Sequence, residues 1–137
     1  MGRIMAIDYG TRRTGIAITD ELQLIASGLT TVPTAELMDF LLDYTRRETV
    51  ECIVVGLPKQ HNNEASESEV HIQGFLKTLE KNLPEIPVDR EDERFTSKMA
   101  FQAMIDGGLK KKQRRNKALV DEISATIILQ SYLYGRQ

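Results

Sequence analysis

Residues 3–19, RIMAIDYGTRRTGIAIT, decide the fold of this 137-residue chain. An apolar run from Arg3 to Asp8 ends at an acid and is followed by the turn Tyr9-Gly10-Thr11. Thr14 to Thr19 then alternates polar and apolar residues with period two, as a half-buried strand does. Because the break between the two runs is short, they are predicted to pair as an antiparallel hairpin. Asp8 therefore ends a strand near the centre of the expected sheet.

The remaining periodicity predicts one mixed α/β domain over residues 1–137. Leu24 to Val32 is expected to complete an antiparallel three-strand meander, and Ile53 to Val55 is typical of a strand buried on both faces. The central sheet is thus expected to be antiparallel at first, then parallel, with helices flanking it. The first predicted helix is capped by Thr34 and has Leu37, Met38, Leu41, Leu42 and Thr45 on one face, and the second has Val70, Ile72, Phe75, Leu76 and Leu79 and ends near Pro84. A strand is predicted at Ile86–Val88. Two further helices are predicted, one from Thr96 or Ser97 to Gly107 and one from Ala118 to Tyr134.

Composition places the chain among soluble globular proteins, with 41% hydrophobic and 28% charged residues. A single cysteine, Cys52, excludes a disulfide framework and a cysteine-rich zinc site. No stretch is apolar for long enough to span a membrane, and an acid at position 8 interrupts any secretory signal core. We therefore expect a cytoplasmic protein with no membrane partner.

A net charge of -2 conceals a strongly basic segment. Lys110 to Lys117 reads KKKQRRNK and contains no acid, so the rest of the chain is acidic. Such an asymmetry favours a polyanionic partner for the basic segment. We expect contacts to nucleic-acid phosphates from Lys111, Lys112, Arg114 and Arg115, although a solvated loop is the alternative explanation.

Three carboxylates occupy positions that a purely structural role explains poorly. Asp8 ends an apolar strand, Glu93 follows another short strand, and Asp121 interrupts an apolar helix. Taken singly, each has a structural explanation, as a turn former, a surface residue or a first-turn helix acid. Taken together, carboxylates that converge at one sheet edge provide the oxygen ligands that Mg²⁺ prefers. The hypothesis that follows is metal-assisted phosphodiester hydrolysis, in which two ions could stabilise the attacking and leaving oxygens.

Small and neighbouring residues carry further expectations. Glycine at positions 10 and 15, on either side of the turn after Asp8, permits close approach of the backbone to a phosphate or a neighbouring strand. The geometry of the hairpin alone is the alternative explanation for these two glycines. Ala125 lies one turn after Asp121 and would let the helix approach the sheet. Glu122 projects about 100° round the helix from Asp121, so we expect it to be solvated.

Four segments of the chain resemble the YqgF family in their order and spacing. They are IMAIDYGTRRTGIAITD (4–20), IVVGLP (53–58), EDERFTS (91–97) and LVDEISATIILQSYL (119–133). This family is also called RuvX-like or Holliday-junction-resolvase-like, and it has the RNase H-like fold. The match extends from Arg3 to about Tyr134. The resemblance therefore implies an RNase H-like nuclease domain over almost the whole chain.

The resemblance also implies roles for particular residues. Asp8, Glu93 and Asp121 would be the catalytic carboxylates that bind Mg²⁺ or Mn²⁺, and Arg94 would contact phosphate or fix Glu93. The implied activity is maturation of the 5′ end of the pre-16S ribosomal RNA, with resolution of Holliday junctions as the alternative. Two departures from the family pattern, the loop KQHNNEASES after Pro58 and an acid at position 91, bear on substrate contacts rather than on the carboxylates.

Two other classes of function stay open. Asp8 to Gly15 also resembles the first phosphate loop of actin-like ATPases and sugar kinases, although those proteins need two such domains and 137 residues are too few. A non-catalytic module that binds structured RNA is the second. Recognition of backbone phosphates does not distinguish RNA from branched DNA. Symmetric junction cleavage requires a two-fold dimer, and no interface is evident, so we expect a monomer or a weak homodimer.

Overall fold

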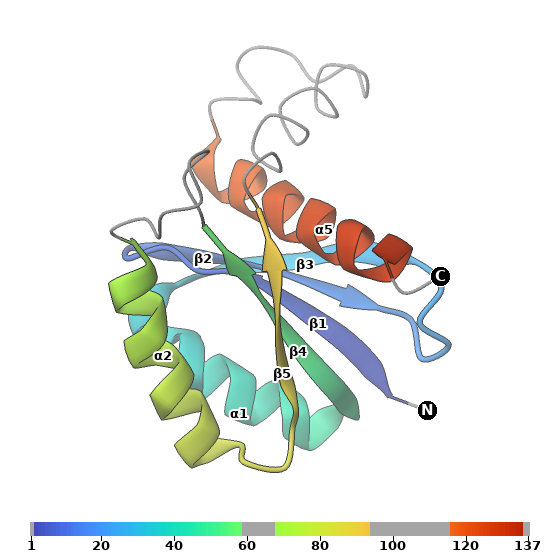
Figure 1. Ribbon diagram of the computed structural model, residues 1–137, viewed down its shortest axis with the longest axis horizontal. Helices are drawn as coiled ribbons and strands as arrows, with labels where there is room; N and C mark the ends of the chain where they lie inside the picture. The colour runs from blue at the N-terminus through green and yellow to red at the C-terminus, as the bar shows by residue number, and fades with distance from the viewer. Residues whose placement is uncertain (1, 59–67, 94–115, 136–137) are drawn as a thin grey trace.

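A mixed sheet of five strands forms the centre of the computed structural model, which describes residues 2–58, 68–93 and 116–135 (Figure 1). The strands lie in the order β3-β2-β1-β4-β5. The pairs β1–β2 and β2–β3 are antiparallel, whereas β1–β4 and β4–β5 are parallel, which confirms the expected sheet. Their bounds are β1 Arg3–Asp8, β2 Arg13–Thr19, β3 Ala26–Pro33, β4 Val50–Leu57 and β5 Val88–Asp92.

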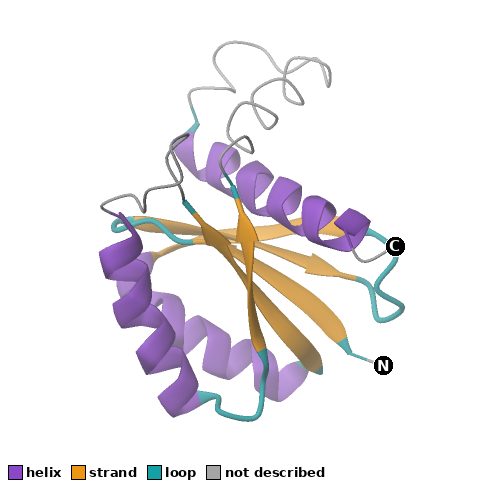
Figure 2. Cartoon of the chain, viewed as in Figure 1, coloured by secondary structure: helices purple, strands orange, loops and turns teal. Residues whose placement is uncertain are grey.

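Helices cover both faces of this sheet (Figure 2). The 3₁₀ helix η1 (Thr34–Glu36), α1 (Leu37–Arg47) and α2 (Ser68–Asn82) lie on one face, and α5 (Lys117–Gly135) lies on the other. Successive side chains of β1 point to opposite faces of the sheet, so this strand contributes to the core on both sides. Met5 packs towards α1 and α2, and Ile4 packs towards α5. Within the described ranges, no helix is long and apolar enough to cross a membrane.

The close seating of α5 on the sheet depends on small residues. Ala125 is completely buried against the sheet, as expected. Gly15 of β2 lies directly against the carbonyl oxygen of Asp121, and a Cβ at position 15 would overlap that atom. Glycine is therefore required there for the approach of α5, and not for the hairpin alone. The contact places the first turns of α5 over the hairpin that follows β1.

The strand β5 is more polar than the sequence predicts. The apolar run Ile86–Val88 is the predicted strand, but the ladder to β4 begins at Val88 and continues to Asp92. Pro87 lacks an N–H, and its carbonyl accepts a hydrogen bond from β4 instead. Asp89 accepts a hydrogen bond from a tyrosine of α5, and Arg90 forms an ion pair with α2. Hydrophobic alternation does not reveal such a strand, because its partners come from distant helices.

Three local predictions are also wrong. Thr34 does not cap α1: its hydroxyl donates to the carbonyl oxygen of Gly10 (2.6 Å) and lies 2.9 Å from the Thr14 hydroxyl. Thr34 thereby connects η1 to the loop after β1 by a hydrogen bond, and α1 begins without a side-chain cap. Leu24 precedes β3, and Val70 is 74% exposed instead of packing with the apolar face of α2. The predicted helix from Thr96 or Ser97 lies outside the described residues.

Candidate metal centre

Parallel strands bring Asp8 and Glu93 to the same edge of the sheet. The strands β1 and β4 pair in register up to Val55, so Asp8 and Gly56 come next at this edge. Glu93 immediately follows β5, and its N–H donates to the carbonyl oxygen of Leu57 at 3.1 Å. Its carboxylate lies against Gly56. The carboxyl ends of β1, β4 and β5 therefore place two of the predicted carboxylates together.

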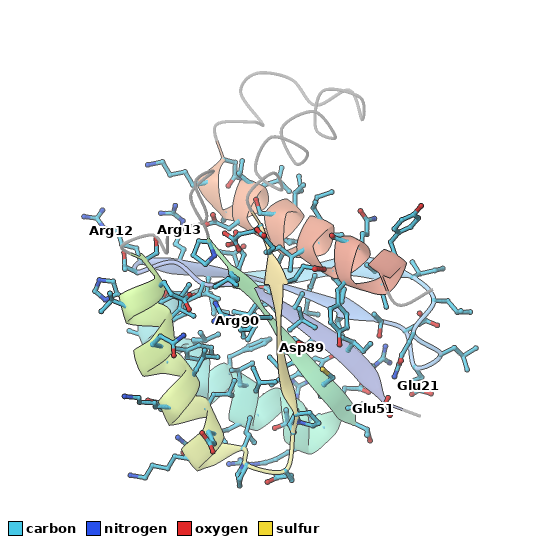
Figure 3. The ribbon with its side chains drawn as sticks, viewed as in Figure 1. Arg12, Arg13, Glu21, Glu51, Asp89 and Arg90 are labelled. Carbon is cyan, nitrogen blue, oxygen red and sulfur yellow. The ribbon has the colours of Figure 1, made fainter. Side chains whose placement is uncertain are left out.

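Asp121 reaches this end of the sheet from α5. Asp8 pairs with Gly15 across β1 and β2, and Gly15 lies beneath the backbone of Asp121. The side chain of Asp121 accepts a hydrogen bond at Oδ2 from Nε of Arg13, at 2.8 Å. Figure 3 shows Arg13 near the end of the sheet at which α5 begins. Three segments that are far apart in the sequence thus contribute carboxylates to one region.

The proximity of these groups appears in their acid–base behaviour. The pKa of Asp8 is raised from 3.8 to about 8, first by burial and then by the negative charges of Glu93 and Asp121. Burial also raises the pKa of Glu93 to about 7, although the charge of Arg90 opposes this rise. At neutral pH in the metal-free protein, Asp8 is consequently mostly protonated, whereas Glu93 is close to the midpoint of its titration.

The donor set suits a hard divalent cation in its chemistry. All three side chains offer carboxylate oxygens, and none of the described residues donates a hydrogen bond to the Asp8 carboxylate. Among the residues that the structure describes, however, no three acidic, histidine or cysteine side chains are already grouped closely enough to enclose an ion. Binding of a cation would therefore require these carboxyl groups to move closer together and to release their protons. Asp8, Glu93 and Asp121 are the residues that could hold such a cation.

Sequence reasoning did not single out Gly56 and Arg13, which contact the predicted carboxylates. A Cβ at position 56 would overlap Oε2 of Glu93 and would lie 3.0 Å from Ile128. The available signal was a glycine directly after a β-branched run, at the point where a buried strand ends. The partner of Arg13 could not be read from the sequence, since Asp121 lies 108 residues away.

The Gly56→Ala variant is expected to weaken Mn²⁺ binding about tenfold, because the added methyl group displaces the Glu93 carboxylate. Calorimetric titration with Mn²⁺ measures this affinity. Gly74→Ala provides the matched control, since a Cβ at position 74 meets no atom within 4 Å, and it should stabilise α2 by up to about 1 kcal/mol. Unchanged Mn²⁺ affinity in Gly56→Ala would show that Glu93 does not depend on this contact.

The other residues singled out from the sequence divide into two groups. Outside the described residues lie Arg94, Lys111, Lys112, Arg114 and Arg115. Glu122, by contrast, lies within the described residues, and the expectation that it is solvated is wrong. Its side chain is partly buried, with the carboxylate against Gly28 of β3. The first turns of α5 therefore present Asp121 and Glu122 to neighbouring strands of the sheet.

Solved structures define the class of fold. The chain superposes on a Thermus thermophilus RuvC in complex with a Holliday junction substrate, with a TM-score of 0.60, 19% identity and coverage of 99% of this chain and 96% of that one. A second Thermus thermophilus RuvC structure matches with a TM-score of 0.57 and 18% identity, over 98% and 95% of the two chains. The fold is thus RNase H-like, as the sequence resemblance implied.

Comparison at the level of sequence identifies the family. The family model described as RuvX, Holliday junction resolvase, matches residues 2–135. A relative from Christiangramia forsetii is 67% identical over 134 residues, covering 98% of this chain and 99% of its own. One from Phocaeicola vulgatus is 64% identical over 137 residues, covering 100% and 99%. Both relatives carry the name "Putative pre-16S rRNA nuclease". The chain belongs to the RuvX family, which confirms the resemblance to YqgF proteins.

Proposed function

We propose that this chain is a metal-dependent nuclease that hydrolyses phosphodiester bonds in the precursor of 16S ribosomal RNA. The observation that carries the proposal is the position of Asp8, Glu93 and Asp121 at one end of the sheet, in a chain that matches the family model described as RuvX, Holliday junction resolvase. Relatives at 57–67% identity carry the name of a pre-16S rRNA nuclease. Together these observations favour catalysis over a binding module without activity.

Each carboxylate has a proposed role in holding one or two divalent cations. Asp8, Glu93 and Asp121 would bind Mg²⁺ or Mn²⁺, which when bound would supply Lewis-acid activation of the scissile phosphate and of water. In the metal-free protein, Asp8 and Glu93 retain protons up to near-neutral pH because burial raises their pKa values. Some of the carboxyl groups at this edge of the sheet are therefore uncharged in the absence of divalent cations.

Basic side chains are proposed to contact the substrate around this edge. An edge rich in carboxylates repels phosphate, so nearby cations are needed to bring a polyanion to it. The basic segment of residues 110–117 runs directly into α5, the helix that carries Asp121. We assign substrate contacts to Lys111, Lys112, Arg114 and Arg115 on this sequence position, and to Arg94 because it directly follows Glu93 in the sequence.

Resolution of Holliday junctions is the second candidate function. The description of the family model and the fold shared with a RuvC bound to a junction substrate favour it. A resolvase must cut two strands symmetrically, which requires two copies of the site related by a two-fold axis. The RNA substrate makes no such demand, so the oligomeric state helps to separate the two functions.

Cleavage of two labelled substrates in parallel tests the proposal. We expect the purified protein to cut a pre-16S RNA fragment with Mg²⁺ or Mn²⁺ but not with EDTA. The variants Asp8→Asn, Glu93→Gln and Asp121→Asn should each lose at least about a hundredfold in rate, whereas Asp39→Asn, on the exposed surface of α1, should cut normally. Preferential cutting of a four-way DNA junction would favour the second candidate. Cleavage by Asp8→Asn at the wild-type rate would exclude the proposed metal centre.

A further inference from the structure

Arg13 joins the first hairpin of the chain to the helix that carries Asp121. It begins β2, opposite Pro33 of β3, and its Nε donates a hydrogen bond of 2.8 Å to Oδ2 of Asp121. Both side chains are part-buried, with 39% of Arg13 and 24% of Asp121 exposed. In Figure 3, Arg12 and Arg13 both lie near the end of the sheet where α5 begins.

Strand alternation explains why Arg13 meets Asp121. Residues 13 and 15 share one face of β2, the face covered by α5, whereas Thr14 contacts the Thr34 hydroxyl on the other face. Gly15 admits the backbone of Asp121, and Arg13 binds its side chain. Two positions on one strand face therefore control both the backbone and the carboxylate of the same residue.

Attachment of α5 to the sheet does not account for this ion pair. The helix is already anchored by the completely buried side chains of Ala125 and Leu129 and the almost completely buried Ile128. A part-exposed ion pair contributes little to the free energy of unfolding, because solvent screens it. The specific feature is instead the geometry, in which one directional N–H occupies one of the two carboxylate oxygens.

We propose that Arg13 is a positioning residue for Asp121, binding Oδ2 and so orienting the carboxylate with Oδ1 available to a divalent cation. This inference rests on the proposed function, in which Asp121 is a metal ligand. Hydrogen bonds from outer partners commonly orient ligating carboxylates, and their loss typically costs about 10- to 100-fold in metal affinity. Arg13 acts through Asp121 and needs no contact with the cation or the substrate.

Measurement of Mn²⁺ affinity in Arg13 variants tests the inference. Arg13→Gln is expected to bind Mn²⁺ about tenfold more weakly than the wild type, with little change in the melting temperature of the metal-free protein. Arg13→Lys, which keeps the charge but loses the fixed guanidinium geometry, should recover only part of this affinity. At saturating Mn²⁺ the cleavage rate of Arg13→Gln should approach that of the wild type, as a role in positioning requires.

Arg12→Gln is the matched control, because it removes the same charge from the neighbouring residue. The Arg12 side chain is exposed and forms no hydrogen bond or ion pair with any described residue, so its Mn²⁺ affinity should stay within about twofold of the wild type. An equal loss in Arg12→Gln would assign the effect to net charge and overturn the inference. Unchanged Mn²⁺ binding in Arg13→Gln would also overturn the inference. Tighter Mn²⁺ binding in this variant would overturn it too, by showing that Arg13 competes with the cation for Asp121.

Asp121→Asn separates this inference from the proposed function. If that variant binds Mn²⁺ as tightly as the wild type, the assignment of Asp121 as a ligand fails, and the proposed metal centre fails with it. If Asp121→Asn loses Mn²⁺ binding while Arg13→Gln retains it, only the role of Arg13 is overturned.

Discussion

The Asp8→Asn variant is expected to lose nuclease activity and, without divalent cations, to be more stable than the wild type above pH 7. Burial and the charges of Glu93 and Asp121 raise the pKa of Asp8 to about 8, so the ionised form is disfavoured in the folded protein. Asparagine has a similar shape and no charge to repel its neighbours. We expect a gain of about 1–3 kcal/mol in the free energy of unfolding at pH 8, below the full value of the pKa shift because solvent reaches part of Asp8.

The sign of the pH dependence follows from the two pKa values of Asp8. In the unfolded chain the pKa is near 3.8, and in the folded protein it is about 8. Between these values the folded state binds more protons, so the free energy of unfolding falls as the pH rises. The contribution is fully present below about pH 4 and is lost as the pH passes 8. The gain in Asp8→Asn should therefore be small near pH 4 and largest above pH 8.

Urea denaturation in a chelating buffer at pH 5 and pH 8 measures this gain. Asp39→Asn, at an exposed carboxylate in the first turn of α1, is the control and should not show a growing stabilisation with pH. Addition of Mg²⁺ should stabilise the wild type more than Asp8→Asn, because the cation compensates the crowded charges. A less stable Asp8→Asn protein at pH 8 would mean that the folded state favours the ionised Asp8 carboxylate.

The Arg90→Ala variant is expected to lose about 3 kcal/mol of stability, since it leaves a nearly buried carboxylate without its oppositely charged partner. Arg90 binds both oxygens of Glu69 in α2, at 2.9 and 2.8 Å. It also donates to the carbonyl oxygens of Val55 and Gly56 at the end of β4. Glu69 is only 9% exposed, and Arg90 is the main cause of its lowered pKa. Denaturation at pH 7 measures the loss.

Two comparisons show whether the unpaired carboxylate causes this loss. The double variant Glu69→Leu with Arg90→Leu should recover most of the stability, because neither charge is then left unpaired. Asp43→Ala breaks the exposed pair with Arg47, whose side chains are 63% and 61% exposed, and should cost about 0.5 kcal/mol at most. The effect of Arg90→Ala should also shrink below pH 4.5, as Glu69 protonates. A loss no larger than that of the surface pair would contradict the argument.

Local patterns in the sequence were sufficient for most of the secondary structure. Period-two alternation predicted β2, and the apolar runs predicted β1 and β4, because each pattern reflects burial within one segment. The helical period predicted α1, α2 and α5 to within a few residues. The prediction for β5 was wrong in its range, since the residues that follow Val88 in that strand are charged and their partners include side chains of α2 and α5. The Thr34 cap was wrong because a competing acceptor, the Gly10 carbonyl, lies in a loop across the fold.

The candidate site shows the same division. Asp8, Glu93 and Asp121 could be selected from the sequence alone, since acids at strand ends and inside an apolar helix are uncommon without a partner or a cation. Their arrangement depends on the sheet order, in which β1 lies between β2 and β4 and so brings the hairpin, β5 and α5 to one edge.

The sequence by itself determined the order of strands and helices, the antiparallel and then parallel character of the sheet, and the three carboxylates. Only the tertiary structure decided that Arg13 binds Asp121, that Glu93 lies against Gly56, and that α5 seats on Gly15. The physical reason is the distance along the chain over which each feature is determined. The periodicity of burial depends on residues that are neighbours in the sequence. An ion pair or a close backbone approach depends on strand register and helix placement, which are determined jointly by residues far apart in the chain.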